Sequence, residues 1–281
     1  MAVQTNSGNN FSGKYLQQTA DIDISTVPNW TKIGTTTTVY FSGTYDGDGH
    51  IVTGLSITST TDSYNGLFGV IGAGGTVKNL GVTGASLSGA NPGLGILAGY
   101  NFGGTVDNCY STGTVTSSNN NAGGLLGSSS GTVTKCYSTG TVTATGATSN
   151  NVGGLIGAGL TTAGSISQCY STGNVSNNNT SGSYNTGGFI GNAVHAISNC
   201  YSIGSVNGGG GRAGGFIGGT GTGTPAFSNC YSTGSVSGTT KGGFLGYVNT
   251  GSFSNCFFDF NTAGTSTVCG SGTPSGTITA K

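Results

Sequence analysis

Six cysteines recur along the chain at intervals of 26 to 33 residues, and thiols at regular spacing could bind a soft metal ion. They are Cys109, Cys136, Cys169, Cys200, Cys230 and Cys256, and Leu80 fills the same slot in an earlier copy of the pattern. A tetrahedral metal site needs ligands that converge from spacings such as Cys-x2-Cys, which a single file does not provide. Leucine in the slot indicates an apolar interior position. The sequence therefore predicts a buried structural ladder and no metal site.

A seventh thiol, Cys269, lies outside this ladder. Adjacent parallel strands hold side chains about 4.8 Å apart, whereas a disulfide brings two Cβ atoms to about 3.8 Å, so disulfides within the ladder are not expected. Cys269 could bond Cys256 in an oxidising compartment.

The acidic residues are the second set with chemical potential. Asp46, Asp48 and His50 form the run DGDGH, which resembles the start of a calcium loop. An EF-hand loop needs a longer acidic series that ends in Glu, and this chain contains no Glu. The Asp-Gly pairs are more typical of a tight turn between strands.

Glycoside hydrolysis generally needs two carboxylates about 5–9.5 Å apart. Five of the seven acids lie within residues 1–62, while Asp107 and Asp259 are far apart in the sequence. Arg212 lies in a Gly-rich segment without a neighbouring acid, and no Ser-His-Asp grouping stands out. We therefore expect no catalytic residues, no cofactor and no enzyme activity.

An aromatic residue follows each ladder cysteine, and alternation places it on the outer surface. This exterior file consists of Tyr110, Tyr137, Tyr170, Tyr201, Tyr231 and Phe257. Aromatic side chains bind sugars and proteins, so these residues are the candidate partner-binding site. Stacked rings also stabilise neighbouring strands by about 0.2–1 kcal/mol per pair. Both roles remain open.

The elements that position these residues follow from a repeat of about 30 residues. Each copy has a Gly-hydrophobic-Gly block, as in GGLLG at 123–127, followed by a run such as TVTKCYSTGTV at 132–142. Such self-similarity indicates one supersecondary unit stacked on its neighbours. We predict an all-β, single-stranded right-handed parallel β-helix with three short strands in each coil.

A bend precedes the cysteine slot in every copy. The residue there is usually Asn, which tolerates left-handed turn conformations and can bond to the stacked amide in the next copy. The bend positions are Asn79, Asn108, Lys135, Gln168, Asn199, Asn229 and Asn255.

The ends differ from the repeats. Residues 15–25 alternate, with Leu16, Ala20, Ile22 and Ile24 expected on one buried face. We assign residues 1–62 to an N-terminal cap with the first coil or coils, 63–260 to repeat coils, and 261–281 to a C-terminal cap or tail, all within one continuous solenoid domain. Loops vary in length after the third strand and after the Gly block, so recognition loops are expected along two edges.

Composition excludes several partners. The chain has 7 basic and 7 acidic residues, net charge zero, and charged residues make up only 5% of it. Nucleic acid is therefore a poor partner, and no apolar run is long enough to insert into a membrane. The first residues do not resemble a signal peptide.

The Gly blocks, the S/T-N-C-Y-S-T-G-x-V runs and the leader Y-L-x-x-T-A-D-I-D-I…FSGTYDGDGHIVTGL together resemble GLUG-motif repeat proteins, which occur in large bacterial surface proteins of the adhesin and IgA-peptidase-like kind. The resemblance implies the solenoid architecture and an extracellular or cell-surface location. It brings no catalytic residues, because the motif is a structural repeat.

Two functions are weighed on this basis. The first is an adhesion or recognition module that binds a glycan or a surface protein through the aromatic file and edge loops. The second is a subunit that associates end to end in an extracellular or virion fibre. Ice binding by Thr112, Thr139, Thr172 and Thr233 is disfavoured because Ile203 interrupts that row.

Overall fold

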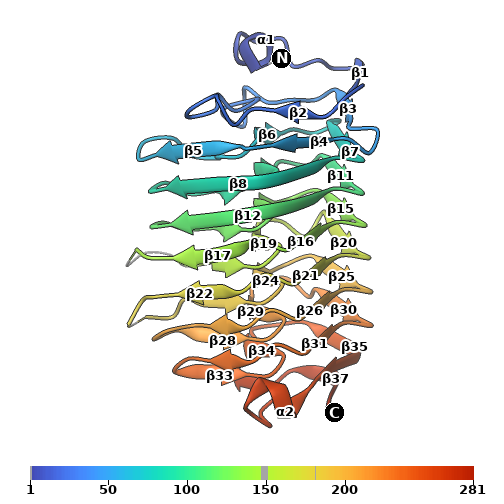
Figure 1. The fold of residues 1–281 in the computed structure, drawn as a ribbon. Coiled ribbons are helices and arrows are strands. Elements are labelled where there is room, and N and C mark those ends of the chain that lie inside the picture. Colours follow the sequence, from blue (N-terminus) through green and yellow to red (C-terminus); the bar gives the residue numbers. More distant parts are fainter. Residues whose placement is uncertain (1, 147–150, 181) are drawn as a thin grey trace.

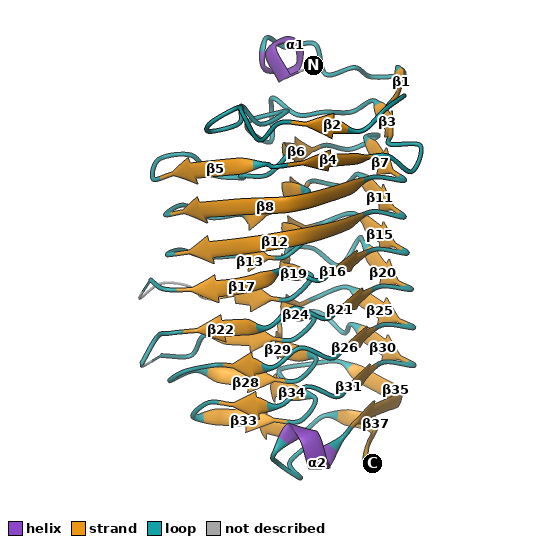
Figure 2. Ribbon diagram, viewed as in Figure 1, coloured by secondary structure: helices purple, strands orange, loops and turns teal. Residues whose placement is uncertain are grey.

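The computed structural model describes residues 2–146, 151–180 and 182–281. The chain forms a β-solenoid of about 8 turns, spaced about 29 residues apart, with almost no helix (Figures 1 and 2). The predicted all-β parallel solenoid is thus confirmed. Equivalent residues of successive coils pair in register, so Val106 lies beside Val133 and Val133 lies beside Ile166.

The largest sheet has 23 strands and runs the length of the solenoid in three columns. The first column contains β1 (Tyr15–Gln17), β3 (Thr44–Asp46), β7 (Thr76–Lys78), β11 (Thr105–Asp107), β15 (Thr132–Thr134), β20 (Ser165–Ser167), β25 (Ala196–Ser198), β30 (Ala226–Ser228), β35 (Ser252–Phe258) and β37 (Ser275–Ala280). The second contains β2 (Ile22–Asp23), β4 (Ile51–Thr53), β16 (Tyr137–Ser138), β21 (Tyr170–Ser171), β26 (Tyr201–Ser202) and β31 (Tyr231–Ser232). The third contains β5 (Ser56–Ser59), β17 (Thr141–Ala144), β22 (Val175–Asn177), β27 (Val206–Asn207) and β32 (Val236–Ser237). Strands β8 (Gly81–Gly89) and β12 (Tyr110–Ser117) span the second and third columns, and β35 and β37 extend from the first column into the second.

The Gly blocks form two further sheets, which the sequence did not predict. One contains β6 (Phe68–Ile71), β10 (Ala98–Asn101), β14 (Leu126–Ser129), β19 (Ile156–Gly159), β24 (Ile190–Ala193), β29 (Ile217–Thr220), β34 (Leu245–Tyr247) and β36 (Cys269–Ser271). The other contains β9 (Leu94–Gly95), β13 (Ala122–Gly123), β18 (Asn151–Gly153), β23 (Asn185–Gly187), β28 (Arg212–Gly214) and β33 (Thr240–Gly242). A complete central coil therefore has five short strands rather than three.

Serine and glycine join these sheets across the interior. The Ser171 hydroxyl donates to the carbonyl oxygen of Gly188 at 2.6 Å, and Ser202 makes the same bond to Gly215. A Cβ atom at Gly188 would lie 2.2 Å from the Gly215 carbonyl oxygen, so only glycine fits there. This close approach of two backbones leaves no alternating pattern in the sequence, which is why strands were not predicted at the Gly blocks.

The expected bends are present in every copy. All seven bend residues have φ between 50° and 56°, as the left-handed turn requires. Asn108 donates to Asn79 at 2.8 Å and Asn229 donates to Asn199 at 3.1 Å, which forms the expected amide contacts. The bend reverses side-chain alternation and directs the following cysteine inward.

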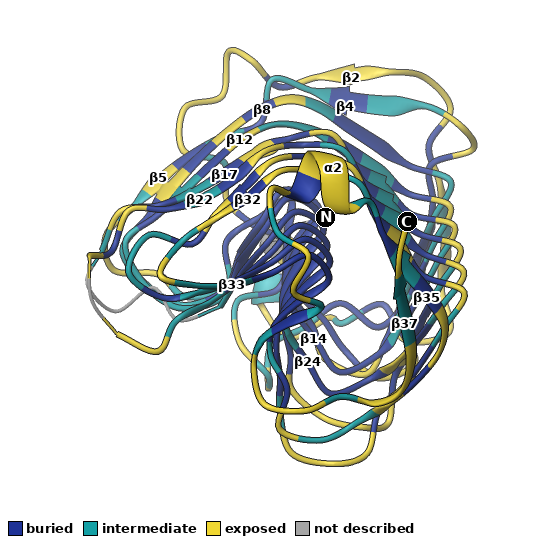
Figure 3. Ribbon diagram, turned by 90° about the horizontal axis from the view of Figure 1, so that it is seen from below, coloured by how far each residue is buried: buried dark blue, intermediate teal, exposed yellow. Residues whose placement is uncertain are grey.

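The interior is filled by rows of like residues. Phe189, Phe216 and Phe244 stack at 4.6 and 5.0 Å between ring centroids and are fully buried. In the end-on view the coils superpose, buried segments line the inside of the wall, and exposed residues gather in the outer loops (Figure 3).

The N-terminal segment corrects one expectation. Residues 15–25 do not form one strand, because a corner separates β1 from β2, and the Gln18 side chain bonds the Ala20 and Ile51 carbonyls there. Alternation is reset at this corner. Ile24 is buried, but Ile22 is 41% exposed and Ala20 is exposed as well.

A short helix lies near each end. Helix α1 (Ala2–Asn6) precedes the first coil, and α2 (Phe260–Ala263) lies across the last one (Figures 1 and 3). The division at residues 62 and 260 remains a prediction.

Candidate recognition surfaces

The cysteine slot is interior in every coil. Leu80 and the six ladder cysteines are at most 1% exposed. All seven cysteines are free thiols. Cys269 lies beside Leu245 and Cys256 beside Ile278, in different sheets, and no disulfide joins them. Burial raises the pKa of the Cys136 thiol, so this group is protonated at neutral pH.

Each central thiol also satisfies a backbone amide. The N–H of Cys136 donates to Sγ of Cys169 at 3.3 Å, and Cys109 makes the same bond to Cys136 at 3.4 Å. The Cys169 thiol in turn donates to the Ser167 carbonyl oxygen at 3.1 Å. The ladder is thus a chain of internal contacts, closed to solvent.

The aromatic file is a continuous stack on the outer surface. Neighbouring rings from Tyr110 to Tyr231 are 4.7–5.0 Å apart between centroids and inclined by only 2–5°. Tyr231 is 40% exposed and the other four tyrosines are half-buried. Burial, followed by the neighbouring phenols, raises the pKa of Tyr170.

This stacking restricts what the file can bind. Inner rings cover each other's faces, and the outer face of Tyr110 lies over Gly81, where a Cβ atom would be 2.4 Å from Cζ. At the other end the Lys281 ammonium lies 4.2 Å from the Phe257 ring centroid. The file therefore offers ring edges and hydroxyls rather than open faces. A hollow of about 490 Å³ lies at its C-terminal end, beside Tyr231 and Phe257.

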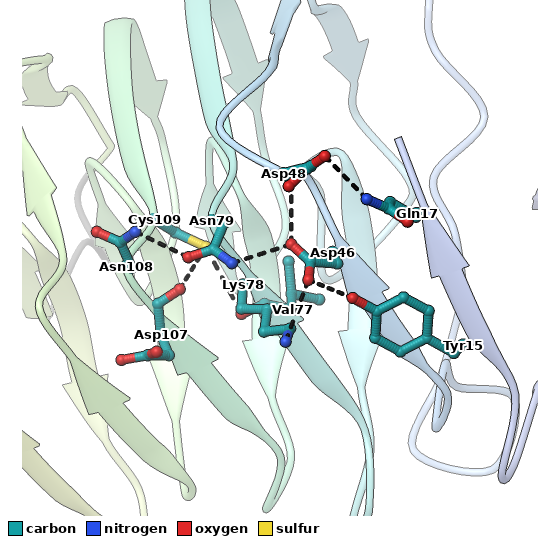
Figure 4. A network of polar contacts seen from close by, with 10 residues as sticks. All are labelled: Tyr15, Gln17, Asp46, Asp48, Val77, Lys78, Asn79, Asp107, Asn108 and Cys109. Atoms are coloured by element: carbon teal, nitrogen blue, oxygen red, sulfur yellow. Dashed lines mark hydrogen bonds and ion pairs between the residues drawn. The ribbon is translucent and has the colours of Figure 1, made fainter. Parts of the chain in front are cut away.

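The DGDGH run links the first coils to one another through hydrogen bonds and an ion pair. Asp46 is buried and accepts hydrogen bonds from Tyr15, from Asn79 at 3.0 Å and from the Asp48 amide at 2.9 Å (Figure 4). The Lys78 ammonium lies 3.1 Å away. Burial alone would raise the pKa of Asp46, but these contacts hold that pKa far below its usual range.

Asp21 and Asp48 also have partners. His50 contacts Asp21 at 3.1 Å rather than Asp46 or Asp48, and Asp48 accepts from Gln17. The turn interpretation of the run therefore fits the geometry, since each carboxylate has a structural contact.

A second hollow lies elsewhere, near the N-terminal end, between the segments 29–36 and 57–65. We call it the N-terminal groove; its volume is about 740 Å³. Its lining residues are Asn29, Trp30, Thr31, Lys32, Thr35, Thr36, Ile57, Thr58, Ser59, Thr60, Thr61, Asp62, Ser63, Tyr64 and Asn65. Backbone and side-chain contacts hold the two segments together, among them Trp30 N–H to the Ser56 carbonyl oxygen at 3.0 Å and Thr58 N–H to Asn29 at 2.9 Å.

Two aromatic residues form walls of this groove. The Trp30 indole donates to the Leu67 carbonyl oxygen at 3.0 Å and also borders an apolar cavity of about 120 Å³ inside the coil. Tyr64 has φ of 57°, a conformation that is uncommon outside glycine and asparagine, and its ring lies 5.4 Å from that of Tyr100. The groove thus pairs aromatic walls with a rim of hydroxyls and amides.

Little in the amino-acid sequence pointed to this groove. Its residues come from two segments about 30 positions apart that precede the recognisable repeats. The only signals were the single tryptophan, in NWTKIG, and the Thr-rich run STTDSYN.

Among the residues that the structure describes, no group of three or more His, Cys, Asp or Glu side chains is arranged to hold a metal ion. Within the same residues, no helix is both long and apolar enough to span a membrane.

Comparison with known proteins supports the repeat assignment. The GLUG motif matches residues 91–116 and 118–143, which confirms the resemblance seen in the sequence. Halomucin from Haloquadratum walsbyi is 42% identical over 87 residues, which is 31% of this chain and 1% of that protein. A protein of Evansella cellulosilytica, provisionally described as a Gly-rich membrane protein, is 39% identical over 103 residues, which is 34% of this chain and 12% of the relative. The chain therefore spans only a small part of either relative.

One solved structure is similar over most of the fold. It is a crystal structure from Bacteroides ovatus, provisionally described as an immunoglobulin A1 protease. It is 26% identical, has a TM-score of 0.64, and the match covers 88% of this chain and 69% of that one.

Proposed function

We propose that this chain is a non-enzymatic recognition module of a cell-surface protein, and that the N-terminal groove binds a saccharide. The observation that carries the proposal is the composition of the groove. A volume of about 740 Å³ falls in the range of small-ligand sites, and aromatic walls beside hydroxyls and amides suit the apolar faces and hydroxyls of sugar rings.

The comparisons support the surface location. One relative has a mucin-type name and the other is described as a membrane protein. The Bacteroides ovatus structure is described as a protease, and that description belongs to that protein. In this chain Asp107 accepts from Thr134 at 2.6 Å and Asp259 caps helix α2, so both carboxylates have structural contacts, which supports a role without catalysis.

The test is binding to a panel of immobilised polysaccharides, with two variants compared in parallel. Tyr64→Ala removes one wall of the groove, and Tyr170→Ala removes one ring of the aromatic file. We expect Tyr64→Ala to lower affinity at least about tenfold, the loss of roughly 1.4 kcal/mol of contact energy. Thermal melting of both variants checks that the fold is intact.

Comparison of the two variants also shows whether the groove or the aromatic file is the binding surface. If Tyr170→Ala alone weakens binding, the aromatic file is the partner site and the groove is not. If the wild-type protein binds no member of the panel, saccharide recognition is refuted.

A second function, end-to-end association, is favoured by the charge distribution. Residues 1–62 contain five Asp and two Lys, a net charge of −3, and residues 63–281 contain two Asp against four Lys and one Arg, a net charge of +3. Strand β37 pairs with β35 on one side, and no other strand of the described residues pairs with it. A net negative N-terminal segment, a net positive charge over the remaining coils and an unpaired strand edge at the last coil favour head-to-tail stacking.

Electron microscopy across a concentration series, at low and high salt, tests this alternative. Filaments of single-coil width that shorten at high salt would establish it, because salt screens exposed charges. Discrete rods at every concentration would exclude it.

A further inference from the structure

We propose that the N-terminal groove selects a saccharide that bears a carboxylate, and that the Lys32 ammonium is the group that recognises it. This inference deepens the proposed function and rests on it. The argument starts from the burial of Lys32, a residue type that is almost never fully buried unless paired.

Lys32 is only 8% exposed. Its stem passes over Gly69, where a Cβ atom would lie 3.0 Å from Cδ of Lys32. The head then lies among the groove residues, and its Nζ donates to the Ser63 carbonyl oxygen at 2.6 Å and to Oδ1 of Asn65 at 3.1 Å. The ammonium is therefore held in one place by the fold.

This ammonium lacks a negative partner. Within the described part of the chain, its two acceptors are neutral oxygens, and it takes part in neither of the ion pairs, which are His50–Asp21 and Lys78–Asp46. An ammonium has three donors, so one N–H has no acceptor among these residues. A buried charge without a counter-ion is costly, and a ligand carboxylate would supply both the charge and the missing acceptor.

The cradle around Lys32 is preorganised. Asn65 is 2% exposed, and its Nδ2 donates to the Asp62 carbonyl oxygen at 2.6 Å, which leaves Oδ1 directed at the ammonium. Tyr64 and Asn65 are fixed in turn by bonds from their amides to the Pro92 and Gly93 carbonyls, at 2.9 and 2.8 Å. No large rearrangement is needed to receive an anion.

Asp62 sets a limit on the charge of the ligand. Its carboxylate is exposed on the rim of the groove, and it is near enough to offset part of the pKa decrease that burial causes in Lys32. Asp62 disfavours ligands with several negative charges. The neutral hydroxyl and amide side chains on the rest of the lining favour a hydroxylated ligand over an acidic peptide.

The experiment measures the affinity of the full chain for matched pairs of a sugar that bears a single carboxylate and its neutral counterpart, such as galacturonate with galactose and glucuronate with glucose. We expect the wild-type protein to prefer the acidic member of at least one pair by roughly 10–100-fold, the size of one charge-assisted hydrogen bond. Lys32→Met should abolish that preference, and Asp62→Asn should increase it.

Two controls accompany these variants. Lys14→Met removes an exposed lysine outside the groove and should leave the preference unchanged. Lys32→Met should melt at the same temperature as the wild type or higher, since a well-packed apolar residue can replace a buried charge without loss of stability. A measured melting temperature therefore separates loss of recognition from loss of fold.

The outcomes distinguish the two proposals. Equal binding of acidic and neutral members would overturn the role of Lys32 and leave saccharide recognition standing. Preference for sulfated sugars or acidic peptides over every carboxylated sugar would overturn the ligand class. Absence of binding to every pair would overturn both proposals.

Discussion

At the residue scale, hydrogen bonding to the backbone as well as side-chain volume determines which residue type suits the cysteine slot. A bend residue with positive φ precedes each thiol, and three of the cysteine amides donate to the sulfur of the next coil. Leu80 fills the slot in the earlier copy without offering such an acceptor. Sulfur is thus a small apolar group that also accepts a hydrogen bond.

Cys169 provides a test of this role. Cys169→Ala should lower the free energy of unfolding by about 1–3 kcal/mol, because the Cys136 amide loses its acceptor inside the protein. Cys169→Arg buries an unpaired charge and should unfold the central coils. Chemical denaturation followed by circular dichroism measures both, and equal stability of the arginine variant and the wild type would show that the slot is not interior.

His195 gives a second prediction, for pH dependence. The ring is fully buried, neither nitrogen has a hydrogen-bond partner within the described residues, and burial lowers the pKa of His195 to about 4. The unfolded chain takes up a proton near pH 6.5 and the folded protein does not, so stability falls as the pH drops from about 6.5 towards 4. The loss should reach about 3 kcal/mol.

The variant His195→Phe keeps a ring in this space without a titratable group. Its stability should change less than that of the wild type between pH 7 and pH 4. If the free energy of unfolding, measured by urea denaturation, falls by the same amount in both proteins between pH 7 and pH 4, His195 is not the source of the pH dependence.

At the scale of the element, the bend is the most informative unit of the repeat. Five of the seven bend residues are asparagine, but Lys135 and Gln168 interrupt the row. Lysine tolerates the left-handed conformation less well than asparagine and has no amide oxygen for its neighbours.

Lys135→Asn should therefore stabilise the protein by about 0.5–1 kcal/mol. Asparagine adopts the left-handed conformation at a lower cost than lysine, and its amide can donate a hydrogen bond to Oδ1 of Asn108. Lys135→Ala is the matched control, since it removes the same charge and brings no amide. We expect a higher midpoint of thermal unfolding in the asparagine variant only. A similar increase in the alanine variant would show that removal of the lysine charge causes the stabilisation.

The bends and inward slots could be predicted because each copy repeats one local pattern. The strands at the Gly blocks could not, since residues such as Gly188 are selected by the approach of another coil's backbone rather than by alternation. The corner near Gln18 and the groove around Trp30 also escaped prediction. Both depend on contacts between segments about 30 residues apart, in the region where the repeat is weakest.

At the scale of the whole molecule, each coil contacts mainly its neighbours, and the register links equivalent residues throughout. Stability in such arrays is close to a sum of coil and interface contributions. Removal of a whole coil should therefore be tolerated, while removal of part of one should not.

Deletion of residues 134–166 joins Val133 directly to Ser167. Because Ile166, which precedes Ser167, pairs with Val133 in the adjacent coil, the deletion removes one complete repeat. The shortened protein should fold, with a β-rich circular dichroism spectrum and a length smaller by about 4.8 Å in small-angle scattering. Deletion of residues 134–150 joins non-equivalent positions and serves as the control, which should fail to fold cooperatively. Failure of both deletions would show that the central coils are not interchangeable.

The recurrence of one pattern in the central coils has a consequence for the evolution of the gene. Repeated segments of DNA recombine out of alignment, and here an exchange between equivalent codons adds or removes one complete coil while every contact type is retained. Each event would shift the N-terminal groove relative to the last coil by one step of about 4.8 Å. Recombination of this kind would therefore change the length of the solenoid in steps of one coil and leave the contacts within each coil unchanged.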